Sequence, residues 1–169
     1  WRRRWADGAA AYHRYFEAMG RNGENFVEIW SAAWSLGLEW TPRQAGYHGI
    51  GQYNQLHAWQ MDRVLEDAER HGIHINYVVH NHGKFSAFSD PEWVFTPFNT
   101  ANGGYLANPL VFFTDERAKR DFLNLMRYTI ARWEIKDFRT SNHLWSTGSF
   151  SGSNLSICSL SLCSSEILG

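Results

Sequence analysis

The feature that most constrains the fold is an alternation of amphipathic helical segments with short β-branched segments. Apolar residues at 12, 15, 16 and 19 follow the i, i+3, i+4, i+7 spacing and predict a helix with one apolar face. Residues 25–34 are short, β-branched and aromatic, and they predict a strand that runs into a loop. The pattern then repeats, with helices expected at 55–71 and 115–133 and a second strand at 73–79. Such an order favours a parallel α/β sheet with right-handed crossovers.

The ends of these segments indicate which edge of the sheet is functional. Asn54 can cap the second helix, Gly72 can end it, and Thr114 can cap the third. The connections that follow helices are short, whereas those that follow strands are long, polar and aromatic, as at 84–113. In parallel sheets, residues that bind ligands collect at the C-terminal ends of the strands. We therefore expect the functional residues in the loops after the two strands.

Composition excludes several classes of function. The net charge of −1 and the lack of any basic run longer than residues 2–4 argue against a nucleic-acid binder. No apolar run approaches the roughly 20 residues that span a bilayer, so no membrane partner is expected. No glycine-rich phosphate loop follows either strand, and no cofactor is expected. Nine tryptophans are more than a core of this size needs, and their flat faces can stack on sugar rings.

The charge distribution divides the chain near residue 133. All 16 Lys and Arg lie at or before Arg139, and Glu166 is the only charged side chain after Thr140. Nine serines fall between 146 and 165. We therefore expect an ordered region at 1–133 and a Ser-rich, irregular tail at 134–169, which is either a flexible extension or non-native sequence. Cys158 and Cys163 lie in this tail and carry no predicted redox or zinc role.

Motifs in the ordered region resemble the cellulase-like glycoside hydrolases, the (β/α)₈-barrel clan that includes family-five cellulases and mannanases. The motifs are NFVEIW at 25–30, WSLGLEW at 34–40, NHG at 81–83, PFNTANGG at 97–104 and RYTIARW at 127–133. Their order over residues 10–133 would cover about three βα units of the eight-unit barrel. The resemblance implies a partial TIM barrel, a β-glycan substrate, and a secreted or periplasmic protein. It also implies that Asn81 and His82 lie at the substrate cleft.

The resemblance stops before the catalytic residues of the family. Its next strand ends in an Asn-Glu pair that holds the acid/base glutamate, and no such pair occurs at 134–143. The nucleophilic glutamate belongs to a still later strand, and Glu28 stands where family members commonly carry arginine. We therefore expect an N-terminal fragment that does not hydrolyse glycans alone, with catalytic residues unknown.

Four carboxylates, at Glu28, Glu39, Asp90 and Glu92, lie near the predicted strand ends or in loops. Retaining glycosidases need two carboxyl groups about 5–5.5 Å apart. None of the four forms a convincing pair in the sequence. Glu28 is expected as a buried or barrel-lining polar residue, and Glu39 as a loop residue near the cleft.

Six residues are candidates for substrate binding: Trp34, Trp40, Asn81, His82, Asn99 and Asn102. The two tryptophans flank the loop after the first strand, where each either stacks on a sugar or is buried under the loop. The asparagines at 99 and 102 either bond sugar hydroxyls or brace their own loop. The remaining indoles on helices and strands, at Trp30, Trp59 and Trp133, are expected in the core.

Two alternatives to a hydrolase fragment stay open. One is a non-catalytic carbohydrate-binding protein that uses the loop tryptophans and His82. The other is a metal-dependent barrel hydrolase, because His80 and His82 are two apart and would point to the same side of a strand. In every case, three βα units leave sheet edges unpaired, and self-association through those edges is expected.

Overall fold

A computed structural model describes residues 8–88, 90–133 and 155–158 of the 169-residue chain. The elements follow the order α2 (Gly8–Arg21), β1 (Phe26–Trp30), α3 (Gln55–His71), β2 (His74–Val78), α4 (Glu116–Trp133) and β3 (Leu155–Cys158). Four 3₁₀ helices lie between β2 and α4: η1 (His82–Phe85), η2 (Trp93–Phe95), η3 (Thr100–Asn102) and η4 (Pro109–Phe113). The predicted helix–strand alternation is confirmed.

The three strands form one parallel sheet in the order β1-β2-β3. β1 is an edge strand, and Glu28 pairs with Asn76 in the register between β1 and β2. The α/β class with a parallel sheet is therefore correct. β3 lies within the segment expected to be wholly irregular, so that expectation is wrong for Leu155–Cys158. The rest of the tail lies outside the described residues.

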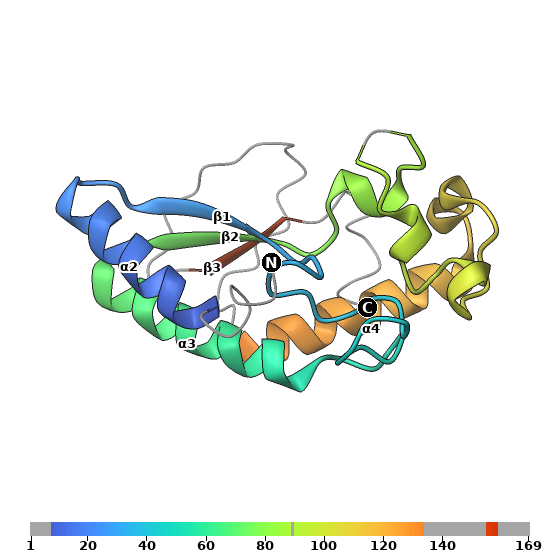
Figure 1. The fold of residues 1–169 in the computed structure, drawn as a ribbon, viewed down its shortest axis with the longest axis horizontal. Helices are drawn as coiled ribbons and strands as arrows, with labels where there is room; N and C mark the ends of the chain where they lie inside the picture. The colour runs from blue at the N-terminus through green and yellow to red at the C-terminus, as the bar shows by residue number, and fades with distance from the viewer. Residues whose placement is uncertain (1–7, 89, 134–154, 159–169) are drawn as a thin grey trace.

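Side chains alternate across the sheet because successive strand residues point to opposite faces. Ile29, Ile75 and Tyr77 are buried on the face that meets the helices. Figure 1 shows α2 and α3 on one side of the sheet, and the core draws on all three helices as well as on β1 and β2. Tyr77 meets Trp133 of α4 edge to face, with ring centroids 5.3 Å apart. Glu28 lies on the opposite face of the sheet, and its side chain is exposed.

Local sequence explains where the helices begin and end. Asn54 caps α3 through a hydrogen bond that its side chain accepts from the His57 N–H at 3.1 Å. Gly72 ends the helix with a φ of 67°, in the left-handed region that glycine tolerates best. The predicted cap of α4 is off by one residue. Asp115, rather than Thr114, accepts the Ala118 N–H, at 2.8 Å.

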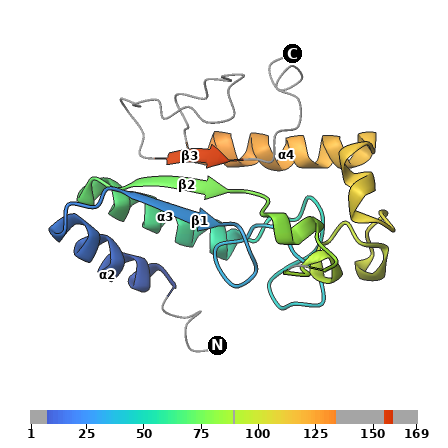
Figure 2. The ribbon, with the colours of Figure 1, turned by 90° about the horizontal axis from the view of Figure 1, so that it is seen from above.

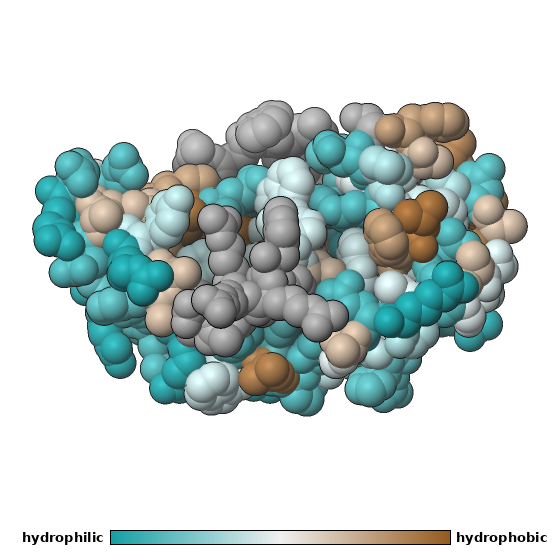
Figure 3. All heavy atoms as spheres, viewed as in Figure 1, coloured by the Kyte–Doolittle hydropathy of each residue, from teal (hydrophilic) through white to brown (hydrophobic). Residues whose placement is uncertain are grey.

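The long loop between β2 and α4 folds as a compact layer at the C-terminal end of the strands (Figure 2). Some of its large apolar side chains are buried, such as Phe98 and Phe112, and the exposed ones are Phe88, Val94, Phe95, Leu110 and Val111. Apolar patches interrupt a mostly hydrophilic surface at this end of the molecule (Figure 3). None of the helices in the described part of the chain combines the length and the apolar character needed to cross a bilayer.

Candidate functional site

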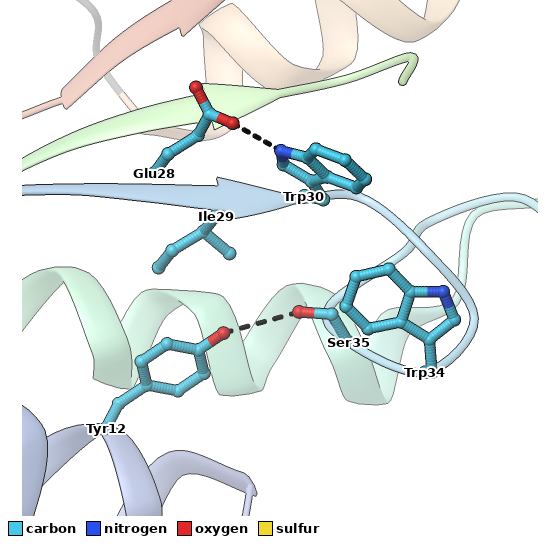
Figure 4. A pocket seen from close by; sticks show the side chains of 6 residues that line it. All are labelled: Tyr12, Glu28, Ile29, Trp30, Trp34 and Ser35. Carbon is cyan, nitrogen blue, oxygen red and sulfur yellow. Dashed lines mark hydrogen bonds between the residues drawn. The ribbon is translucent and has the colours of Figure 1, made fainter. Parts of the chain in front are cut away.

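A shallow pocket of about 300 Å³ lies along β1 and the loop that follows it (Figure 4). It is lined by Tyr12, Glu28, Ile29, Trp30, Trp34 and Ser35. Tyr12 of α2 closes one side through a hydrogen bond with the Ser35 hydroxyl at 3.3 Å. The pocket therefore lies between α2, the end of β1 and the loop that follows β1.

Two tryptophans connect the pocket to two carboxylates. Trp30 donates its indole N–H to Glu28, and the Trp34 indole donates to Glu92 at 3.3 Å. The two indole rings are tilted at 52°, with centroids 6.1 Å apart. Trp34 is 49% exposed, so part of its ring is open to solvent. It has the exposure that stacking on a ligand requires.

His82 extends this group on the other side of Trp30. Its imidazole meets the Trp30 ring edge to face at 5.7 Å, and its Nε2 lies 3.2 Å from the Asp90 carboxylate. Asp90 has a φ of 47°, which aspartate tolerates better than most residues. Both side chains are more than half exposed, so the pair is screened by water. We call the six residues Glu28, Trp30, Trp34, His82, Asp90 and Glu92 the strand-end strip.

A second polar group lies buried beside the strip, centred on Lys84 of η1. Its ammonium donates to the Val79 carbonyl at 2.8 Å and approaches His80 Nδ1 at 3.2 Å. Burial lowers the pKa of Lys84 to about 8, and the nearby carboxylates of Glu39 and Glu92 oppose this shift. Nothing in the sequence marked Lys84, because lysine is rarely fully buried and no periodic pattern covers this loop.

Glu39 is the acidic member of the buried group. Its carboxylate accepts the Gly51 N–H at 2.6 Å and is 3% exposed. Burial raises the pKa of Glu39 to about 7, while the Gly51 bond and the charge of Lys84 act in the opposite direction. This group can exchange a proton near neutral pH, but it is closed off from the pocket surface. It braces the loop after β1 rather than facing a ligand.

His80 belongs to the buried group and not to a metal pair with His82. Burial, reinforced by the charge of Lys84, holds the pKa of His80 well below its usual value, so the ring is neutral. Four phenylalanine rings, Phe85, Phe98, Phe112 and Phe122, surround it with centroids 5.0–6.3 Å away.

The predicted pairing of His80 with His82 fails because β2 ends at Val78. The two-residue period of a strand therefore does not extend to these positions. His80 is buried, whereas His82 is exposed and bonded to Asp90.

The asparagines brace the loop layer. Asn99 donates to the Trp93 carbonyl at 3.1 Å and accepts the Ala101 N–H at 2.9 Å. Asn102 donates to the carbonyls of Val94 and Thr96. Of the two roles left open by the sequence, these internal bonds match the bracing of their own loop, although Asn102 Oδ1 finds no hydrogen-bond partner among the described residues.

Asn81 and Trp40 are also buried, at 5% and 3% exposure. Asn81 Oδ1 lacks a partner within the described part of the chain. Trp40 stacks on Phe95 with centroids 6.4 Å apart, so its predicted open face is covered. Of the six predicted binding residues, Trp34 and His82 are thus the two that reach the surface of the strip.

No protein-family model matches the sequence, and a search of curated proteins found no significant relative. The assignment of a function therefore depends on the geometry and on the sequence motifs. The strip offers one half-exposed indole, an imidazole and three carboxylates within one surface. This combination suits a neutral, polyhydroxylated ring, which stacks through its C–H face and bonds through its hydroxyls.

Proposed function

We propose that this chain is the N-terminal part of a glycoside-hydrolase-like α/β unit and that its strand-end strip binds β-linked glycans. The observation that carries the proposal is the half-exposed Trp34 indole, held beside carboxylates at the C-terminal end of parallel strands. The sequence motifs at 25–40, 81–83 and 97–104 support the same substrate class, because they form this end of the molecule.

The strip is built to orient a sugar rather than to cleave it. Glu28 accepts the Trp30 N–H and the Asn76 amide, the latter at 3.2 Å, and Glu92 accepts the Trp34 N–H. Each carboxylate holds an indole in place, and these bonds favour a fixed stacking surface. We therefore assign Glu28 and Glu92 to positioning the indoles rather than to general acid catalysis or nucleophilic attack.

The proposal is tested by titrating the purified chain with cello- and manno-oligosaccharides in a calorimeter and by assaying the same samples for reducing sugar. We expect saturable binding of one of the two series without release of reducing ends. If neither series gives a binding heat, the binding function is contradicted. Turnover would contradict the view that the catalytic groups lie elsewhere.

A further inference from the structure

A cluster of metal-ligating side chains lies outside the strip, where α2 packs on α3. His13 of α2 and the Asp67 and His71 side chains of α3 each offer one ligand atom, and these atoms all lie within 4.8 Å of one another. Asp67 and His71 are four residues apart on one helix, so they share a face. Within the described residues, this is the one such group of three or more.

Asp67 is the centre of the group. Its side chain is 11% exposed, and both carboxylate oxygens lie 2.9 Å from Nδ1 of His13. The imidazoles of His13 and His71 meet edge to face around it, with centroids 5.6 Å apart. Two imidazoles thus cover a nearly buried carboxylate, and a bound cation would supply the counter-charge that such a carboxylate needs.

The orientation of His71 supports a ligand role. Its Nδ1 lies 2.8 Å from the backbone carbonyl of Asp67, to which it can donate, and 3.7 Å from the Asp67 carboxylate, so the ring is held against Asp67. Metal-binding histidines commonly fix their second nitrogen through such a bond. His13 is 57% exposed and can turn its ring without disturbing the core.

We propose that His13, Asp67 and His71 bind a divalent transition-metal ion, with Zn²⁺ the best fit, and that the ion fastens α2 to α3. Two imidazole nitrogens and one carboxylate oxygen are typical zinc ligands, and water completes the tetrahedron on the exposed side of His13. Tetrahedral ligands at 2.0–2.2 Å from zinc are roughly 3.4 Å apart. The widest separation in the group, at most 4.8 Å, would therefore shorten by up to about 1.4 Å, while the 2.9 Å separation of His13 Nδ1 from the Asp67 oxygens would lengthen slightly. The proton on His13 Nδ1 that now bonds Asp67 is released to solvent when the metal takes its place.

The test is a Zn²⁺ titration of the chelator-treated 169-residue chain, with thermal unfolding followed with and without the ion. Both cysteines are alkylated first, because thiolates also bind zinc. We expect one site and a higher Tm with zinc. The loss of an outer-shell partner already weakens metal binding about 10–100-fold, so His13→Ala and His71→Ala should each weaken it by more than about 100-fold.

Two further variants make the result specific. His48→Ala removes an exposed histidine of the loop after β1 and should bind zinc as the parent does. His13→Cys keeps a ligand and should recover binding that His13→Ala loses, when its thiol is left unalkylated in a Cys158→Ser, Cys163→Ser background. A parent chain that takes up no zinc overturns the proposal, as does uptake that His71→Ala leaves unchanged while its circular dichroism matches the parent.

Discussion

The two polar groups at the strand ends, the buried group around Lys84 and the strand-end strip, differ in burial. The difference separates side chains that brace the loops from side chains that are open to a ligand. The buried group of Lys84, Glu39 and His80 has most of its polar atoms bonded to loop backbone or to one another. The strand-end strip also holds a histidine and carboxylates, but its His82 and Asp90 are more than half exposed. Residue type alone therefore does not show which side chains a ligand can reach. Solvent exposure does, and among the six candidates it singles out Trp34 and His82.

The largest effect is expected from Lys84→Met, which keeps much of the side-chain volume and removes the ammonium. The Val79 carbonyl and His80 Nδ1 would lose their donor. A buried acceptor left unpaired costs about 1–3 kcal/mol, so the variant should lose more than about 2 kcal/mol of unfolding free energy. Urea unfolding at neutral pH measures this loss.

Lys119→Met is the matched control, because this lysine pairs with Glu116 at the surface of α4. We expect a change within about 0.5 kcal/mol. Equal losses in the two variants would show that burial of Lys84 does not stabilise the loop.

The buried group should also shape the pH dependence of stability. The pKa of Glu39 rises from 4.5 to about 7 on folding, so the folded chain binds more protons between these values and stability falls as pH rises through this window. The pKa of Lys84 falls from 10.5 to about 8, so the unfolded chain binds more protons there and stability rises with pH from about 8 to 10.5.

Glu39→Gln should remove the first of these two slopes, and the second should begin at a lower pH, because the Glu39 charge no longer raises the pKa of Lys84. Unfolding free energies measured by urea titration across both windows test this. A slope below neutral pH that is the same in the parent and in Glu39→Gln would contradict the assignment to Glu39.

The smallest loss of unfolding free energy is expected in the exposed strand-end strip. His82→Ala removes the contact with Asp90, and exposed ion pairs contribute about 0–1 kcal/mol. We expect a change in unfolding free energy below about 1 kcal/mol, measured by urea unfolding under the same conditions as Lys84→Met. A loss as large as that of Lys84→Met would show that the strip is part of the folding core.

Local sequence patterns correctly predicted the order of helices and strands. Asn54 and Gly72 bound α3 as expected, because caps depend on residues a few positions apart. The burial of the residues that follow the strands was harder to predict. Trp59 was expected in the core but is 53% exposed on α3, while Trp40 and Asn99 are buried by loop residues more than 50 and about 6 positions away.

Long-range packing explains the remaining errors. The spacing of His80 and His82 predicted one shared side, yet the chain leaves the strand before it reaches them. His13 and Asp67 are 54 positions apart, and no local pattern could join them. Such contacts follow from how α2 and α3 dock, which sequence periodicity predicts only in part.

The central claim is that exposure at the strand ends decides glycan binding, and two tryptophans test it most directly. Trp34 and Trp59 are 49% and 53% exposed, but only Trp34 belongs to the strip. Aromatic contacts contribute about 0.5–1.5 kcal/mol beyond area burial, so Trp34→Ala should weaken oligosaccharide binding by at least about 2–10-fold in calorimetry. Trp59→Ala should bind as the parent does. Unchanged affinity in Trp34→Ala, or an equal loss in both variants, would contradict the account.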